Sequence, residues 1–291
     1  MGRDGIIVKG IGGFYYVLIN GEIVECRARG RFRKDGIIPM VGDRVVVASD
    51  NDVIEEILPR KNRLIRPSVA NIDYIGIVIA TKSPIPDYML VDKLMVYARM
   101  QDIKPILIIN KIDLADNEYI DEIMEMYAGA KCPIFQISCK TYEGIDELAR
   151  AFSDGIISLA GQSGVGKSSL INALHPSLKL EVGDISDKLG RGRHTTRYVE
   201  LLSLPYGGMV VDTPGFSSIS LSQIAPTDLK SYYPEFEEYQ YECKFGSGCM
   251  HRDEPECCIK EKVKEGHISK DRYDRYIKIL EELEERGVEY R

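Results

Sequence analysis

The amino-acid sequence predicts a multi-domain α/β protein with three parts: a small β-barrel, a parallel sheet covered by helices, and a helical C-terminal part. Three observations support this. Residues 1–66 alternate β-rich runs with Gly, Asn and Asp turns, residues 67–222 alternate apolar strands with helical patterns, and residues 223–291 combine helical patterns with clustered cysteines. The chain of 291 residues is 44% hydrophobic and 29% charged, which is typical of a globular protein. We place the domain boundaries after residues 66 and 222.

The first part has the pattern of a small closed barrel. Its β-rich runs are bounded by turn residues and show no convincing helical periodicity. About five strands in about 65 residues fit an OB-fold. The clearest runs are residues 5–10, 13–20, 21–29 and 41–49.

The barrel segment is basic although the whole chain is acidic. Residues 1–66 have a net charge of +3, whereas the whole chain has −7 and the other 225 residues therefore −10. Arg27, Arg29, Arg31 and Arg33 recur at every second position, so an extended strand or hairpin arm would place four guanidinium groups on one face. We expect this face to bind RNA phosphates; the alternative is a solvated charged strand.

The central part has the pattern of a doubly covered parallel sheet, because its strands are almost wholly apolar and alternate with helices. The expected strands are residues 74–80, 104–110, 133–138, 155–161, 198–204 and 208–213. The expected helices lie near residues 88–100, 117–128, 144–153 and 167–175, and a final helix begins near residue 269.

A phosphate-binding loop follows the fourth of these strands. Residues 161–168 read G-Q-S-G-V-G-K-S, which matches G-x-x-x-x-G-K-[ST] between a strand and a helix. The glycines let backbone N–H groups surround the phosphates, the lysine reaches the β- and γ-phosphate oxygens, and the Ser168 hydroxyl binds Mg²⁺. A chance glycine-rich turn would lack the flanking elements. The residues predicted to bind phosphate are Gly161, Gln162, Ser163, Gly164, Val165, Gly166, Lys167, Ser168 and Ser169.

A second loop predicts that the base is guanine. Residues 110–113 read N-K-I-D, and the Asp113 carboxylate can accept two hydrogen bonds from guanine N1–H and its exocyclic amine. Adenine has no such donor pair and would leave that carboxylate unpaired. Asn110 and Lys111 should flank the base, while residues 138–140 supply a backbone amide to the guanine oxygen. The predicted base-binding residues are Asn110, Lys111, Ile112, Asp113, Ser138, Cys139 and Lys140.

Two further loops predict the switches of a GTPase. In the D-x-x-G motif at 212–215, Asp212 should hold Mg²⁺ through water and the Gly215 amide should sense the γ-phosphate. Thr196, or else Thr195, should close on Mg²⁺ and the γ-phosphate. Phe216 stands where many GTPases place a water-orienting Gln, so we expect slow hydrolysis by the isolated protein. His194 is the nearest candidate to orient the water; the alternative is a solvated loop histidine.

The motifs occur in an unusual order, because the base-reading loops precede the phosphate loop. This is a cyclic shift of the usual GTPase order, with the cut after D-x-x-G. A nucleotide site requires its loops at one edge of the sheet and not in a given chain order. The sequence therefore predicts a circularly permuted GTPase that hydrolyses GTP with Mg²⁺.

A cysteine and histidine cluster predicts a metal site in the C-terminal part. Cys243-x5-Cys249-x-His251-x5-Cys257 offers three thiolates and an imidazole, the ligand set of a closed tetrahedral zinc site. We expect one structural Zn²⁺, with redox-active or merely buried cysteines as the alternative, and Cys258 as a possible substitute for Cys257. The N-terminus has no signal-peptide pattern and no apolar run reaches the length of a membrane span, so we expect a cytoplasmic protein.

With these motifs, the chain resembles the ribosome small subunit-dependent GTPase A family of bacteria over nearly its full length. The resemblance rests on the permuted motif order, on G-R-H-T-T at 192–196, on D-T-P-G-F at 212–216 and on the cysteine-rich stretch at 243–257. One departure is the gap of five residues between the first two metal ligands, where the family has four; Gly246 and Gly248 can absorb the additional residue as a bulge.

The resemblance implies an OB-fold, a permuted GTPase domain and a C-terminal zinc domain. It also implies a role in late maturation of the small (30S) ribosomal subunit, binding to 16S rRNA and stimulation of hydrolysis by the subunit. The ribosome is then the alternative to His194 as the source of the catalytic group. Other readings are a regulatory G protein that switches a protein partner, and a zinc-dependent enzyme, which the four filled ligand positions disfavour. We expect a monomer.

Overall fold

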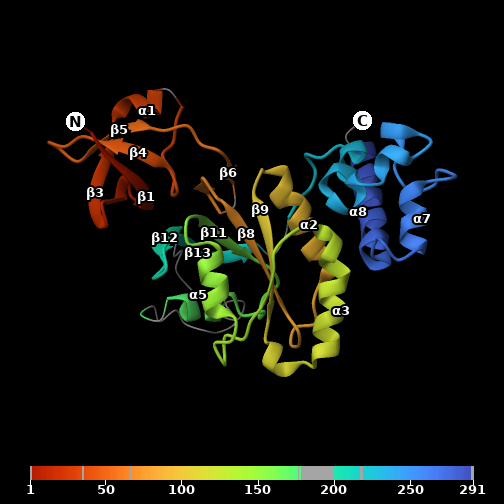
Figure 1. The fold of residues 1–291 in the computed structure, drawn as a ribbon. Coiled ribbons are helices and arrows are strands. Elements are labelled where there is room, and N and C mark those ends of the chain that lie inside the picture. Colours follow the sequence, from red (N-terminus) through yellow and green to blue (C-terminus); the bar gives the residue numbers. More distant parts are fainter. Residues whose placement is uncertain are drawn as a thin grey trace. The chain divides into compact units, whose positions relative to one another are not determined.

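The computed structural model describes residues 2–34, 36–65, 67–175, 177, 199–216 and 219–289, and only the backbone of residues 33, 213–216 and 286–289. The chain forms two compact units, each assembled from separate segments. The first unit comprises Met1–Gly76, Ile145–Ala160 and Lys167–Phe216, and the second comprises Ile77–Gly144, Gly161–Gly166 and Ser217–Arg291. Figure 1 labels most of their helices and strands.

A closed five-stranded barrel begins the first unit and confirms the predicted OB-like fold. Strands β1 and β2, β2 and β3, β4 and β5, and β1 and β4 pair antiparallel, while β3 and β5 pair parallel and close the circle. Closure leaves the barrel without a free edge. Its strands are β1 (Arg3–Ile11), β2 (Phe14–Ile19), β3 (Glu22–Ala28), β4 (Arg44–Val47) and β5 (Val53–Ile57).

The barrel contains a short helix that the sequence pattern did not predict. Helix α1 (Gly30–Lys34) follows β3 directly, and its Phe32 is buried with Ile7, Val17 and Ile54 in the barrel core. Burying a phenylalanine side chain contributes about 1.5–3 kcal/mol, which outweighs the weak helix-forming tendency of five residues. A tertiary contact therefore stabilises this helix.

The first unit also contains part of the central region of alternating strands and helices. Strand β12 pairs antiparallel with β13 and joins the barrel strand β1 at a single register pair, Lys9 with Glu200, while β11 and β13 run parallel. The prediction that all central strands run parallel is therefore wrong for β12, because the short connection to β13 permits only a hairpin. The additional elements are β6 (Arg63–Leu64), β7 (Val69–Ala70), α4 (Ile145–Ala151), β11 (Ile156–Ala160), α5 (Lys167–Leu174), β12 (Glu200–Ser203) and β13 (Met209–Phe216).

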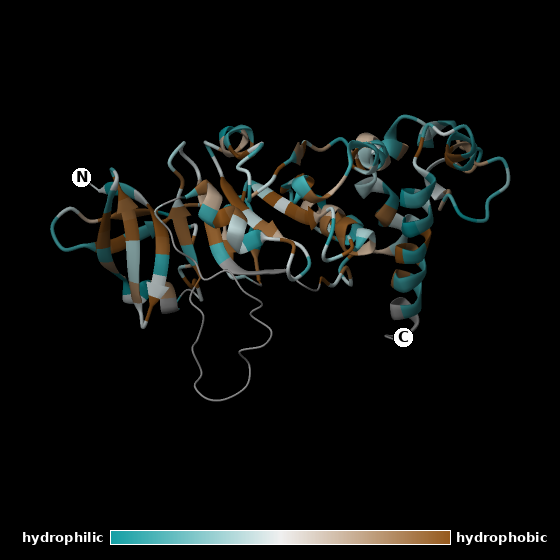
Figure 2. Cartoon of the chain, turned by 90° about the horizontal axis from the view of Figure 1, so that it is seen from below, coloured by the Kyte–Doolittle hydropathy of each residue, from teal (hydrophilic) through white to brown (hydrophobic). Residues whose placement is uncertain are grey.

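The second unit begins within β8 (Tyr74–Ala80). It contains the strands and helices of the central region that carry the predicted base-reading loops. Strands β9 (Lys104–Asn110) and β10 (Ile134–Gln136) run parallel. Every residue of β9 after Lys104 is buried, and the strands are correspondingly hydrophobic in Figure 2. Helices α2 (Tyr88–Met100) and α3 (Asn117–Tyr127) begin with the capping side chains of Asp87 and Asp116. Two short helical turns, η1 (Ile112–Leu114) and η2 (Ala128–Ala130), also belong to this region.

The C-terminal part is helical and packs on one apolar cluster. Tyr233, Phe236 and Tyr276 are its largest buried side chains, and their rings meet at centroid distances of 5.0–5.4 Å. Helix α8 is otherwise largely hydrophilic (Figure 2). The elements are η4 (Pro226–Tyr232), α6 (Pro234–Glu237), η5 (Gln240–Glu242), η6 (Gly246–Gly248), α7 (Cys258–Lys264) and α8 (Lys270–Glu289).

A buried ion-pair network joins α8 to α2. Arg272 donates to Asp92 and to Glu235 at 2.6 Å each, and all three side chains are at most 4% exposed. Arg275 contacts the second oxygen of Asp92. Among the described residues, no helix combines the length and apolar character required to cross a membrane.

Candidate nucleotide and metal sites

The backbone of the predicted phosphate loop packs against the predicted base-reading loop. Gly161 has φ +135°, and a Cβ atom there would lie 2.2 Å from the Val78 carbonyl oxygen. Gly166 has φ +100°, and a Cβ atom there would lie 2.4 Å from Nδ2 of Asn110. Both positions therefore require glycine for conformation and for space.

Asn110 connects three loops through its side-chain amide. Its Nδ2 donates to the Val165 carbonyl at 2.8 Å, and its Oδ1 accepts from the backbone N–H groups of Lys111 at 2.8 Å and Cys139 at 3.3 Å. The side chain is only 1% exposed. Because this buried amide uses both its donor and its acceptor, it fixes the phosphate loop and both base-reading loops relative to one another.

Lys111 and Asp113 are held in orientations that suit a guanine nucleotide. The Lys111 ammonium donates to the carbonyl of Gly164 at 2.8 Å and also to that of Ser83, so the lysine stem lies along the phosphate loop. Asp113 accepts from the Ser138 hydroxyl at 2.7 Å through Oδ1, and its side chain is 15% exposed. One carboxylate oxygen is thus fixed while the group stays accessible to a base.

A segment that the sequence analysis did not select also supports this site. Thr81 donates its hydroxyl to the Lys111 carbonyl at 2.7 Å, and the Asp87 backbone N–H donates to Oε1 of Gln162 at 2.9 Å. Asp87 in turn caps α2 by accepting from Leu90 N–H. The available signal was the Ser-Pro-Ile-Pro-Asp stretch at 83–87, which directly follows a buried strand.

Lys167 and Ser168 begin helix α5 directly after the glycine loop. Burial lowers the pKa of the Lys167 ammonium to about 8. A phosphate group would favour the charged form, because an adjacent negative charge stabilises an ammonium.

Asp212 lies on β13 opposite Glu200 of β12. Burial raises the pKa of the Asp212 carboxyl, the Glu200 charge raises it further, and the Lys9 charge acts in the opposite direction. The backbone of β13 includes Gly215 and ends at Phe216. His194, Thr195 and Thr196 lie outside the described residues, so their predicted positions stay predictions.

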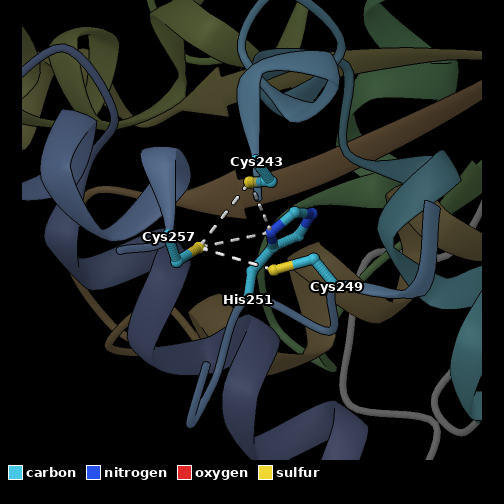
Figure 3. Close-up of side chains that lie close together, drawn as sticks. All are labelled: Cys243, Cys249, His251 and Cys257. Carbon is cyan, nitrogen blue, oxygen red and sulfur yellow. Dashed lines mark hydrogen bonds between the residues drawn. The ribbon is translucent and has the colours of Figure 1, made fainter. Parts of the chain in front are cut away.

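The four predicted metal ligands converge in the C-terminal part (Figure 3). Their ligand atoms all lie within 4.8 Å of one another, and all four residues are buried. The group contains Cys257 and not Cys258. Gly246 adopts φ +50° in the turn η6, so the five-residue gap is accommodated between Cys243 and Cys249.

His251 presents one ring nitrogen to the sulfur atoms. Nδ1 lies 3.4 Å from the Cys257 sulfur and 3.7 Å from that of Cys243, while the buried Nε2 has no hydrogen-bond partner in the part of the chain that the structure describes. Burial lowers the pKa of His251 to about 4, so the imidazole is neutral near pH 7 and can act as a ligand. Three thiols and a neutral imidazole at these distances fit a tetrahedral soft-metal site.

The predicted arginine face takes a different form. Strand β3 ends at Ala28, so Arg27 is on the strand, Arg29 follows it, and Arg31 lies on α1 with the backbone of Arg33. The predicted extended face of four side chains is therefore wrong. Arg27 stacks over the Phe14 ring at 4.9 Å, and Arg29 pairs with Glu55. Arg27, Arg29 and Arg31 are all exposed.

These features together define a phosphate-loop GTPase whose base-reading loops precede its phosphate loop, attached to a small barrel and a Cys₃His cluster. Residues 57–222 match the family described as RsgA GTPase, and residues 4–54 match the RsgA N-terminal domain. The chain therefore belongs to the RsgA GTPase family and is a GTP-hydrolysing enzyme with a circularly permuted GTPase fold.

Relatives and solved structures agree with this assignment. A protein of Caldanaerobacter subterraneus subsp. tengcongensis, named small ribosomal subunit biogenesis GTPase RsgA, is 46% identical over 97% of this chain and 96% of its own. The crystal structure of YjeQ from Thermotoga maritima has a TM-score of 0.85 at 40% identity, covering 97% of this chain and 99% of its own. YloQ, described as a circularly permuted GTPase, has a TM-score of 0.83 at 36% identity over 98% and 96%. The resemblance inferred from the motifs is confirmed.

Proposed function

We propose that this enzyme acts in late maturation of the small ribosomal subunit, where it binds 16S rRNA and hydrolyses GTP at a rate that the subunit stimulates. The similarity over nearly the full length to relatives named small ribosomal subunit biogenesis GTPase carries this proposal. The functional divisions are the barrel at 1–66, the GTPase domain at 67–222 and the zinc domain at 223–291. The protein works as a cytoplasmic monomer.

The GTP site in this proposal uses the motif residues in their usual roles. Asp113 reads guanine, residues 161–169 bind the phosphates, and Mg²⁺ is held by Ser168, Thr196 and, through water, Asp212. When bound, the ion neutralises the charge that develops on the phosphates. The arrangement around Asn110 supports this assignment, because it joins the base-reading and phosphate-binding loops through one buried amide.

The metal in the C-terminal part is one structural Zn²⁺ held by Cys243, Cys249, His251 and Cys257. The four donors leave no open position for substrate, so the ion stabilises the local fold and does not take part in hydrolysis.

The exposed arginines of the segment from the end of β3 to α1 bind rRNA phosphates in this proposal. The basic charge of residues 1–66 and the exposure of Arg27, Arg29 and Arg31 support it. Binding to the subunit should therefore weaken steeply with salt. A variant with all four arginines replaced by Glu should lose subunit binding, whereas Lys131→Glu, which alters an exposed lysine outside this segment, should not.

The decisive experiment measures GTP hydrolysis with and without purified small subunits, with Lys167→Met as the inactive control. A stimulated rate supports the proposal. A slow rate that the subunit does not change supports the second candidate, a regulatory G protein whose partner reads the bound nucleotide.

A further inference from the structure

Three charged side chains form a row across three strands of the first unit. Lys9 of β1 is the register partner of Glu200 on β12, and Glu200 is the register partner of Asp212 on β13. Register partners point to the same face of a sheet with their Cβ atoms about 4.5–5.5 Å apart. The row therefore runs from the barrel to the carboxylate of the D-x-x-G motif.

The first two members of this row form an ion pair. The Lys9 ammonium donates to Oε2 of Glu200 at 2.6 Å, and the two side chains are only 30% and 35% exposed. Partial burial limits screening by water and salt, so each charge acts on its neighbours more strongly than a fully exposed charge would.

Glu200 lies next to Asp212, so the negative charge of its carboxylate requires a compensating positive charge. Like charges directly opposite on antiparallel strands repel each other. Without Lys9, a second carboxylate would face the Asp212 position and would add one negative charge beside the ion that Asp212 holds through water. With Lys9 in place, the net charge of the pair is zero.

We propose that Lys9 and Glu200 are positioning residues for the magnesium site: Lys9 holds the Glu200 carboxylate and cancels its charge, so that Asp212 alone presents negative charge to the ion. This inference rests on the proposed role of Asp212. It also gives the barrel a direct effect on the GTPase centre, because Lys9 belongs to strand β1 of the barrel.

The test is a Mg²⁺ titration of the full-length protein bound to a fluorescent GDP analogue, which measures ion affinity and requires neither turnover nor ribosomes. Lys9→Met leaves one uncompensated negative charge and should tighten Mg²⁺ binding. Glu200→Gln leaves one uncompensated positive charge and should weaken it. Each change should be about 3- to 10-fold, the size expected for a unit charge on the strand next to a divalent ion in a largely aqueous dielectric. The double variant should lie within about 2-fold of the parent protein, because its net charge is restored.

The design separates a charge effect from loss of structure. Both single variants break the same ion pair, so a merely structural role would move Mg²⁺ affinity in one direction and would leave the double variant impaired. Lys131→Met is the matched control, because it also removes the positive charge of one ion pair, with Glu237, and this pair includes neither Lys9 nor Glu200.

Two outcomes overturn the inference. Single variants that shift affinity in the same direction, or that behave like Lys131→Met, exclude charge compensation. Asp212→Asn distinguishes this failure from failure of the Asp212 assignment. If Asp212→Asn leaves Mg²⁺ affinity unchanged, the assignment of Asp212 is wrong and the inference that depends on it is wrong as well. If Asp212→Asn weakens Mg²⁺ affinity but the Lys9 and Glu200 variants do not change it, only the inference is wrong.

Discussion

Replacing Arg272 with Met should weaken the packing of helix α8 on α2, because Arg272 is the centre of the buried ion-pair network. Its side chain is 2% exposed and donates to Asp92 and Glu235 at 2.6 Å each. It also lies over the rings of Tyr127 and Tyr233, at 4.9 and 5.3 Å from their centroids. Methionine preserves much of the volume but removes every charged hydrogen bond.

The expected cost follows from the partners that the variant leaves behind. Asp92 keeps Arg275, but Glu235 loses its Arg272 partner in a site where its side chain is 4% exposed. Breaking a buried pair in this way costs about 3–5 kcal/mol, since one charge stays buried without compensation. Arg275→Met should cost less, about 1–2 kcal/mol, because Arg272 still pairs with Asp92 and the Arg275 side chain is 12% exposed.

Hydrogen exchange of the α8 backbone amides between Tyr276 and Leu283 measures this loss locally, which suits a chain of several domains better than a single global unfolding curve. Arg272→Met should accelerate exchange by at least about 100-fold, because every 1.4 kcal/mol of the expected loss of about 3–5 kcal/mol corresponds to a factor of about ten. Combining it with Glu235→Gln should recover part of the loss, because the stranded charge is then removed. Equal exchange in the Arg272→Met and Arg275→Met proteins would refute the reasoning.

Three further predictions concern the sites. Removal of the metal by a chelator, or by the double substitution Cys243→Ala and Cys249→Ala, should make residues 223–291 more sensitive to protease. The affinity for guanine nucleotide, measured by fluorescence, should stay within about 3-fold of that of the parent protein. If the double variant still binds one zinc ion tightly, the proposed ligand set is wrong. At pH 8.5, an ammonium whose pKa is about 8 is about one-quarter protonated, so GDP binding, which raises the pKa of Lys167, should take up as much as about 0.75 proton. Calorimetry in buffers of different ionisation enthalpy measures this uptake, and Lys167→Arg should show almost none. His194→Ala should lose most of the subunit-stimulated hydrolysis with GTP affinity within a few-fold, and equal stimulation would assign the missing group to the ribosome.

Many elements and site residues of this protein could be predicted from its sequence, because they depend on local patterns of residues. The sequence predicted α2 at 88–100, the strands β8 and β9 and the position of the phosphate loop, because buried parallel strands, amphipathic helices and glycine turns each have a short-range pattern. Ligand spacing predicted the Cys₃His group for the same reason, since its members lie within fifteen residues. Motif order alone indicated the circular permutation.

Long-range packing decided the features that these patterns missed. The burial of Phe32 turns part of the arginine segment into a helix, and so removes the extended face that alternation predicted. Convergence of the ligands selects Cys257 over its neighbour Cys258 and turns Nδ1 of His251 toward the sulfur atoms. Lys9 and Glu200 are 191 positions apart, and no local periodicity relates them. Such contacts depend on how strands and helices pack against one another. Local sequence patterns therefore determined most of the elements and the chemistry of the loops, while the tertiary structure determined helix α1, the direction of β12 and which distant charges act on the loops.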